Sequence, residues 1–459
     1  MVAAGVVLAV SAACSGGSSG SKAAPSSSTA AATTTTARPR HPQGGTARVG
    51  VWGDPNPDAA TLGGAAVRSL VLPQLFVARP DGTWAPSLVE PGSDRTAPDS
   101  RTATLRLRPA SVWSDGTPVT ADDLRRSADA RFVAGVDGPA PDGTLTLRFT
   151  QTLPGWRRLW SGADAVTPPR PGLWGGPFVL AGYTPGLEAV LRANDRFAAG
   201  RPYLDELHLV LVPDSGVAYE LLDHGQLDVL MPPAGTVRTT KLRTVPGVSV
   251  DTAAGGGWRV ALLLRQGGLT RDQRAAVAAS VDRGTFVGTL LQGEAVVDDG
   301  YSGAWKGAGP GDTAALKGTT ADLVGELEEP MTPTLQRSMQ LRAHPQGGRL
   351  ELRNAEADRV EGWVAAGTYQ AAIVMTLDGP VPCWTCRWAS VDEARARAAD
   401  AGDQAAATAL EAELRDQALL LPLWRPTTVV AVRNGLHGVA ANGYALSGAW
   451  NAGDWWRSG

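Results

Sequence analysis

Alternating hydrophobic and polar positions predict several β-strands along this chain. In residues 103–107, Ala103, Leu105 and Leu107 alternate with polar or basic neighbours, which is the period of a half-buried strand. The stretch 371–377, AAIVMTL, is hydrophobic apart from Thr376 and predicts a buried strand. The alternating pattern predicts further strands at 47–51, 142–150 and 207–212.

Residues 111–124, SVWSDGTPVTADDL, predict a turn that leads into a capped helix. Asp115-Gly116 is a turn pair, since Asp bonds its own backbone and Gly accepts a positive φ. Pro118 then favours an extended residue before it. Thr120 can cap the helix that follows, and Asp123, three residues on, completes a capping box. The sequence therefore predicts a unit of strand, turn and helix.

The order of Trp, Asp-Gly, Pro, Thr-Ala and Asp in residues 107–124 resembles a known signature. It is similar to the pattern LR-x-G-x-x-W-x-DG-x-P-x-TA-x-D-V of the extracytoplasmic solute-binding proteins of peptide and nickel ABC importers (family 5). Further sequence patterns similar to those of the family occur in residues 174–230 and 255–296. The second of these ranges contains a helix pattern that is held by Asp272, Arg274, Ala275, Val277, Ala278, Val281, Asp282 and Arg283.

The resemblance implies an α/β fold of the type II periplasmic-binding-protein kind. Such a fold has two α/β lobes joined by a hinge, together with a smaller subdomain. The segments near 125–141 and 301–345 match poorly and are shorter than in the family. The expected divisions are lobe I at 46–254 with a small subdomain at about 65–165, lobe II at 255–423, and a return to lobe I at 424–459.

The start of the chain is typical of an exported lipoprotein. Residues 2–13 form a hydrophobic run that ends in small residues before Cys14, and this run is too short to span a bilayer. It resembles a lipobox, which implies lipidation of Cys14, although no Lys or Arg precedes it and Ser11 stands where Leu is usual. An ordinary cleaved signal is the alternative. Residues 15–45, rich in Ser, Thr and Ala, predict a flexible linker.

Composition limits the classes of partner. The 459 residues can form more than one hydrophobic core, and 43% of them are hydrophobic. A net charge of -3 gives no basic surface for nucleic acid. The 15 Trp residues supply large amphipathic side chains, which suit both cores and ligand clefts.

Cys383 and Cys386, in the sequence CWTC, predict a local disulfide if the chain is exported and Cys14 carries lipid. A redox pair of the thioredoxin kind would need the first Cys at a helix N-terminus, and Pro382 precedes it here. A zinc site would need two further ligands. The remaining Cys, Cys14, is expected to carry lipid, and the sequence has no suitably spaced His pair.

The sequence contains no motif for catalysis. Its five His are scattered without an H-E-x-x-H pattern, and Ser302 lies in GYSGA rather than in G-x-S-x-G. The acidic pair Asp298-Asp299 reads as solvated loop charge. We therefore expect neither an enzyme nor a bound metal or cofactor.

The resemblance also implies residues that contact ligand. In oligopeptide-binding members, an Asp after the strand at 371–377 accepts the α-ammonium of the peptide, and Asp378 stands one place from that position. An ordinary turn residue before Gly379 is the alternative. Expected aromatic residues at the cleft, with burial in a core as the alternative for each, are Trp52, Trp258, Trp384 and Trp388.

The expected function is that of a substrate-binding lipoprotein of an ABC importer. It would be a monomer, anchored by lipid on the extracytoplasmic face of the cell membrane, and would deliver a peptide or similar small solute to the permease. The alternative is a relative that keeps the fold but serves as an envelope scaffold or regulator without transport.

Overall fold

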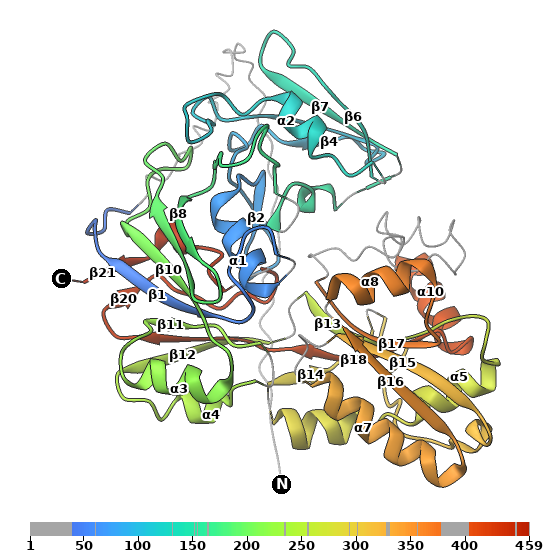
Figure 1. Cartoon of the computed structure of the whole chain (residues 1–459). Helices are drawn as coiled ribbons and strands as arrows, with labels where there is room; N and C mark the ends of the chain where they lie inside the picture. The colour runs from blue at the N-terminus through green and yellow to red at the C-terminus, as the bar shows by residue number, and fades with distance from the viewer. Residues whose placement is uncertain are drawn as a thin grey trace, which may run out of the picture. The chain divides into compact units, whose positions relative to one another are not determined.

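A computed structural model gives the fold. It describes residues 39–458, apart from 60, 131, 151, 154, 163–164, 234–235, 255–256, 293, 301, 327–330, 356, 378–403 and 446–447. The chain divides into two compact units, Met1–Arg40 and His41–Gly459. All elements described below belong to the second unit (Figure 1).

The first large sheet has seven strands in the order β12-β19-β11-β1-β10-β9-β8. Strand β1 lies in the middle and runs parallel to β10 and β11. This sheet contains the strands predicted at 47–51 and 207–212. Its strands are β1 (Thr46–Val51), β8 (Phe178–Thr184), β9 (Glu188–Ala193), β10 (Glu206–Leu211), β11 (Val229–Leu230), β12 (Val248–Ala253) and β19 (Thr428–Arg433).

Short helices flank this sheet, and each of its faces packs into a hydrophobic cluster of its own. Val49 of β1 packs with helix α1, whereas Gly50 points towards the other cluster. A Cβ on Gly50 would lie 2.8 Å from both Leu227 and Leu230, so only glycine fits there. The helical elements are α1 (Leu62–Val71), α3 (Ser215–Asp223), α4 (Thr239–Leu242) and η6 (Ala452–Asp454), and a small hairpin is formed by β20 (Leu436–His437) and β21 (Trp456–Arg457).

A separate small subdomain has its own core, which contains buried residues from Leu75 to Leu173. Helix α1 packs in the core of the first large sheet instead, so this core begins after residue 65, where we expected the subdomain to start. Its elements are β2 (Phe76–Ala78), β3 (Trp84–Pro86), β4 (Arg95–Thr96), β5 (Thr102–Arg106), α2 (Ala121–Arg126), β6 (Val133–Asp137), β7 (Thr144–Phe149) and η1 (Trp156–Arg158).

Three Asp-Gly-Thr turns connect parts of this subdomain in the same way. In each, an Asp carboxylate accepts hydrogen bonds from the backbone N–H and the hydroxyl of the Thr two residues later. The intervening glycines have φ of +77°, +89° and +81°, which disfavours any residue with a Cβ. The turns are Asp81-Gly82-Thr83, Asp115-Gly116-Thr117 and Asp142-Gly143-Thr144.

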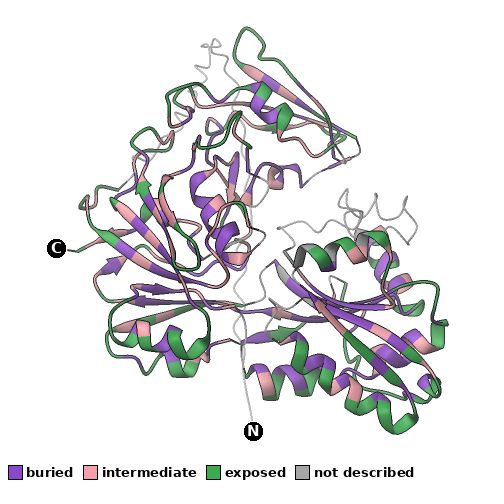
Figure 2. Cartoon of the chain, in the orientation of Figure 1, coloured by how far each residue is buried: buried purple, intermediate pink, exposed green. Residues whose placement is uncertain are grey.

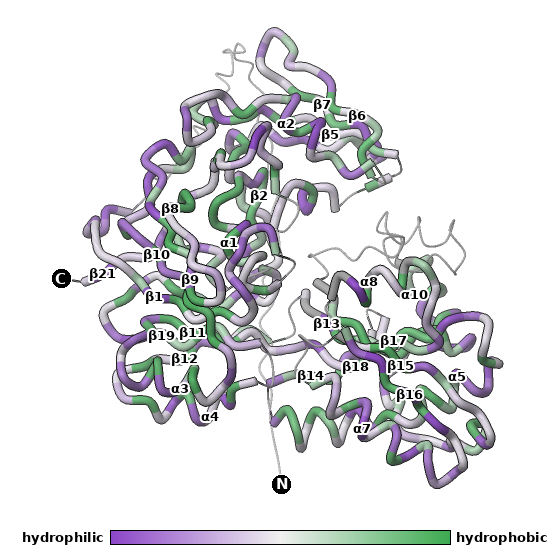
Figure 3. Tube along the Cα trace, viewed as in Figure 1, coloured by the Kyte–Doolittle hydropathy of each residue, from purple (hydrophilic) through white to green (hydrophobic). Residues whose placement is uncertain are grey.

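The second large sheet has six strands in the order β14-β18-β13-β17-β15-β16. Strand β17 (Ala371–Leu377) has the predicted bounds, and Figure 3 shows it as strongly hydrophobic. The other strands are β13 (Trp258–Leu264), β14 (Ala295–Val297), β15 (Thr320–Glu326), β16 (Arg349–Ala355) and β18 (Leu420–Pro426).

Helical elements cover this sheet and enclose one large core with its strands. Figure 2 shows buried residues along the strands and exposed residues on the helices around them. The helical elements are α5 (Arg271–Ala279), α6 (Arg283–Thr285), η3 (Phe286–Leu291), η4 (Ala314–Leu316), α7 (Thr332–Ala343), η5 (His344–Gln346), α8 (Ala357–Ala366) and α10 (Gln404–Asp416). Strand β18 belongs wholly to this sheet and continues to Pro426, past the boundary that we expected at 423.

Candidate functional site

The chain passes between the two large sheets twice. Both passages connect the same edge of the first sheet with the same edge of the second sheet. It leaves the first sheet at the end of β12 and enters the second at the start of β13; it returns from the end of β18 to the start of β19. Strands β12 and β11 are both antiparallel to β19, so β12 runs in the direction of β1, β10 and β11. The passages therefore lie at the carboxyl ends of these parallel strands.

The second sheet shows the same relation. Strand β17 is antiparallel to β13 and parallel to β15, which in turn is parallel to β16. The carboxyl ends of β15, β16 and β17 thus lie at the edge where β13 begins. Ligands of open α/β sheets bind outside the carboxyl ends of the strands. We therefore take these two carboxyl edges as the candidate site.

On the first sheet, the loop after β1 is closely packed. Trp52 is partly buried against the cluster that contains α3 and α4. Gly53 has φ of +74°, and a Cβ there would lie 2.8 Å from the Cβ of Thr61. The hydroxyl of Thr61 donates to the main-chain oxygen of Asp54 at 2.5 Å. The loop is therefore fixed at the start of α1, and it presents a Trp and an Asp at the carboxyl edge.

Tyr183 holds the Asp54 side chain at this edge. It lies near the carboxyl end of β8, and its hydroxyl donates to Oδ2 of Asp54 at 2.7 Å. This hydrogen bond, assisted by desolvation, raises the pKa of Tyr183, so the phenol stays a donor at neutral pH. Oδ1 of Asp54 is buried and has no hydrogen-bond partner within the described ranges. A buried carboxylate oxygen without a partner is costly, which marks this loop as one to test for function.

On the second sheet, the pairing of two strands brings two of the predicted positions to one place. Trp258, the first residue of β13, pairs with Leu377, the last residue of β17. Asp378 follows Leu377 directly in the sequence but lies outside the described residues. The backbone register thus places Trp258 opposite the end of the strand that precedes Asp378.

A buried ion-pair group lies beside Trp258 and corrects one expectation. Asp298 is not a solvated loop charge, because only 1% of it is exposed. Its carboxylate contacts Nε of Arg259 at 2.6 Å and Nε of Arg425 at 3.3 Å, and it accepts the N–H of Gly300 at 3.0 Å. A buried carboxylate requires such partners. The sequence showed only the adjacent acids Asp298 and Asp299. The two arginines that pair with Asp298 come from β13 and β18.

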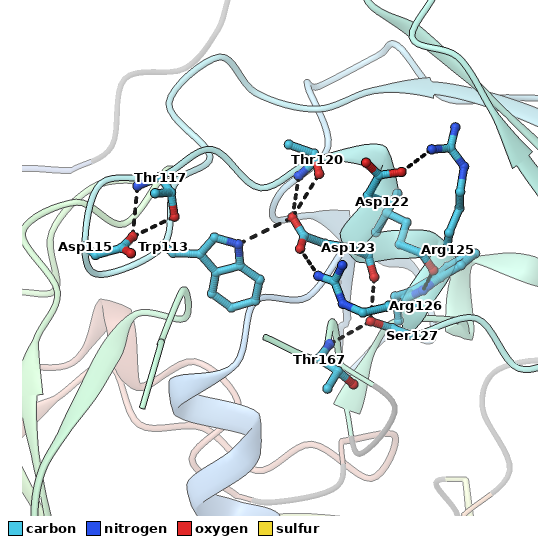
Figure 4. A network of polar contacts seen from close by, with 12 residues as sticks. Trp113, Asp115, Thr117, Thr120, Asp122, Asp123, Arg125, Arg126, Ser127 and Thr167 are labelled. Atoms are coloured by element: carbon cyan, nitrogen blue, oxygen red, sulfur yellow. Dashed lines mark hydrogen bonds and ion pairs between the residues drawn. The ribbon is translucent and has the colours of Figure 1, made fainter. Parts of the chain in front are cut away.

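The signature stretch is a structural network (Figure 4). Oδ2 of Asp123 accepts the N–H of Thr120 at 2.7 Å and its hydroxyl at 3.1 Å, and the indole N–H of Trp113 lies 3.4 Å away. Asp123 also pairs with Arg126. The predicted capping box of α2 is confirmed. Because Trp113 and Asp123 are almost fully buried, this part of the motif supports the core of the small subdomain.

Two further searches concern the described part of the chain only. No cluster of three or more His, Cys, Asp or Glu among these residues has the arrangement of a metal site. No helix within them combines the length and apolar character needed to cross a membrane.

Comparison with known families assigns the chain. Residues 83–317 match the sequence profile described as bacterial extracellular solute-binding proteins, family 5, middle region. That match spans more than half of the chain. The protein belongs to this family.

Relatives and solved structures agree with family 5. OppA of Mycobacterium tuberculosis H37Rv, an oligopeptide-binding protein, is 27% identical over 261 residues, which cover 48% of this chain and 43% of OppA. The chain thus matches less than half the length of this relative. Among solved structures, AppA of Bacillus subtilis in complex with a nonapeptide has a TM-score of 0.74 at 14% identity, covering 92% of this chain and 100% of that one. NikA of Staphylococcus aureus in complex with Ni(L-His)2 has a TM-score of 0.67 at 13% identity, with 87% and 97% covered.

These matches confirm the predicted family and the predicted fold class of type II periplasmic binding proteins. The profile describes family 5 members as extracellular solute-binding proteins, and the relative OppA is an oligopeptide-binding protein. Of the predicted ligand residues, Trp52 and Trp258 lie at the two carboxyl edges. The predictions at Asp378, Trp384 and Trp388, the disulfide between Cys383 and Cys386, and lipidation at Cys14 fall outside the described residues.

Sequence reasoning missed Asp54 and Tyr183. Asp54 lies three residues after the end of β1, in the sequence Gly-Asp-Pro. An acidic residue in the loop after the central parallel strand was the available signal, since ligands of open α/β sheets bind outside the carboxyl ends of the strands. Tyr183 gave no signal, because its partner lies 129 residues away.

Proposed function

We propose that this protein is the substrate-binding component of an ABC importer, and that it takes up a peptide or a similar small solute and delivers it to the membrane permease. The observation that carries the proposal is the family match over residues 83–317. The oligopeptide-binding relative and the peptide complex of AppA support the peptide class.

The proposed site lies between the two carboxyl edges. Peptide ligands of extended shape are bound through main-chain hydrogen bonds, with pockets for alternate side chains. Trp52 from the first lobe and Trp258 from the second would contact apolar parts of the ligand. In the segment after β17, Asp378 would accept the α-ammonium of a peptide, and Trp384 and Trp388 would add indole surface.

The location that we propose is the extracytoplasmic face of the cell membrane. Acylated Cys14 would hold the chain there, residues 15–45 would serve as a tether, and the protein would act as a monomer. Cys383 and Cys386 would form a local disulfide. Replacing Cys14 by Ser should release the protein into the soluble fraction, and persistent membrane association would contradict the anchor.

Isothermal titration calorimetry of the purified full chain tests the proposal. The panel is a set of peptides of graded length, a nickel–histidine complex and a neutral sugar. We expect a peptide to bind with a Kd of about 1 μM or tighter, equivalent to about -8 kcal/mol. Tighter binding of the nickel complex would change the substrate class. Binding of no panel member would favour the scaffold alternative.

A pair of Trp variants tests whether the ligand binds at the second carboxyl edge. Trp258→Ala should weaken peptide binding at least tenfold, because it removes an aromatic contact at the second carboxyl edge. Trp363→Ala is the matched control. It removes an indole that stacks on the guanidinium of Arg353, at 4.0 Å from Cζ to the ring centroid on the second lobe, and it should leave the affinity unchanged. Equal losses in both variants would indicate a general effect on folding.

A further inference from the structure

Glu294 connects the two lobes by a buried side-chain contact. Only 3% of this residue is exposed, and it directly precedes β14 of the second sheet. Its Oε1 accepts the N–H of Thr239 at 2.7 Å. Thr239 is the first residue of α4, which packs against β12 of the first sheet. A carboxylate of one lobe therefore holds the backbone of the other, across 55 residues of sequence.

The main chain of Glu294 is fixed at the second passage between the sheets. Its carbonyl oxygen accepts the N–H of Thr427 at 2.8 Å, and Thr427 is the residue between β18 and β19. The next residue, Ala295, pairs with Pro426 at the end of β18. The carboxylate thus projects from backbone that is tied to the passage itself.

All connections between the lobes that we describe gather at one corner of each sheet. In the first sheet, β12 and β19 are neighbours at one end of the strand order, and in the second sheet β14, β18 and β13 are neighbours at one end. The two chain passages use these strands. Glu294 and Thr239 add a non-covalent connection beside them. The opposite ends of the two sheets, β8 and β16, lie furthest from this corner in strand order and would move most in a rotation about it.

When one lobe rotates against the other, the hydrogen bond between Glu294 and Thr239 either persists or breaks. Breaking it leaves the buried carboxylate of Glu294 without this donor and the partly buried N–H of Thr239 without this acceptor. Hydrogen bonds to charged groups are among the stronger ones in proteins. We propose that Glu294 is a hinge clasp, a positioning residue that restricts the rotation by which the lobes would close on ligand. Its role in binding rests on the proposed function, whereas its effect on lobe motion does not.

Distances between spin labels in the ligand-free full chain test the clasp. Labels are attached at Leu187→Cys on the first lobe and Leu352→Cys on β16, two positions that are 54% and 40% exposed, with the three native Cys replaced by Ser. We expect one narrow distance distribution in this parent. Glu294→Ala should broaden it, and should speed hydrogen exchange of the Thr239 amide about tenfold or more.

A second variant removes the other partner and keeps Glu294. Thr239→Pro deletes the donor at the first helical position, where Pro is well tolerated. The preceding Arg238 already has the extended φ of -72° and ψ of 122° that a following Pro requires. This variant should broaden the distance distribution as Glu294→Ala does.

Glu411→Ala is the matched control. Glu411 is also buried, but its carboxylate accepts the N–H of Ser302, at 2.7 Å, from the same lobe. This variant should leave the distance distribution narrow. The proposal is overturned if neither clasp variant broadens the distribution, or if Glu411→Ala broadens it equally. Because no ligand is used, failure to find a bound peptide would not affect this result.

Discussion

Replacing Asp123 by Ala should destabilise the small subdomain far more than any other change in the signature helix. Asp123 is 4% exposed, and its carboxylate accepts the N–H and hydroxyl of Thr120 and pairs with Arg126. Alanine would remove the capping box and the carboxylate oxygen that lies 3.4 Å from the indole nitrogen of the buried Trp113. A lost cap costs about 0.5–2 kcal/mol and an unsatisfied buried group about 1–3 kcal/mol. We expect a loss of about 2–4 kcal/mol in the local unfolding free energy.

Hydrogen exchange of the β5 and β7 amides measures this loss, because these strands form the sheet of the small subdomain. At about 1.4 kcal/mol per tenfold change, protection should fall by about thirty- to a thousandfold. The matched control is Asp122→Ala. Its side chain is 75% exposed and pairs with Arg125 in the same helix, so protection should change less than about threefold. Equal effects of the two variants would refute the assignment of the motif to structure.

Three other changes have definite expected outcomes. Burial raises the pKa of Tyr219 to about 12, and its hydroxyl has no hydrogen-bond partner among the described residues. Tyr219→Phe should therefore leave the thermal midpoint unchanged or raise it. A clear fall in the thermal midpoint would show that the hydroxyl has a hydrogen-bond partner. Asp378→Asn should weaken binding of a peptide with a free amino end by about ten- to a hundredfold in calorimetry, and it should barely change the thermal midpoint. A lower thermal midpoint with unchanged affinity would show that Asp378 is an ordinary turn residue. Hydrogen bonds from Thr residues lower the pKa of the three Asp-Gly-Thr carboxylates. Their contribution to stability is therefore present above the unfolded Asp pKa of about 3.9 and is lost as the pH falls through the lower folded pKa. Protection of the subdomain amides from hydrogen exchange should decline below about pH 4 in the native chain, and it should decline less when Asn replaces Asp81, Asp115 and Asp142.

The sequence predicted β17 and the start of α2 correctly, because residues close together in the sequence determine both elements. The hydrophobic stretch at 371–377 gave the bounds of β17, because a strand between covering layers is apolar along nearly all of its length. Thr120 and Asp123 predicted the start of α2, since a capping box is formed by residues three apart. Both predictions needed no knowledge of distant residues.

The contacts that define the site and the hinge depend on residues far apart in sequence. Asp298 looked like a surface charge because its cations, Arg259 and Arg425, lie 39 and 127 positions away. Glu294 and Thr239 are likewise 55 positions apart. Spacing cannot reveal such pairs, and only the register of the two sheets brings them together.

The central claim is that ligand binds between the two carboxyl edges. Hydrogen exchange of the full chain, measured with and without the tightest peptide of the calorimetric panel, tests it most directly. We predict that the peptide slows exchange in the segments that contain Trp52, Asp54 and Trp258, and leaves the segment of Leu341 on the exposed side of α7 unchanged. Slowed exchange confined to α7 or to the amino ends of the strands, with none at the carboxyl edges, would contradict the account.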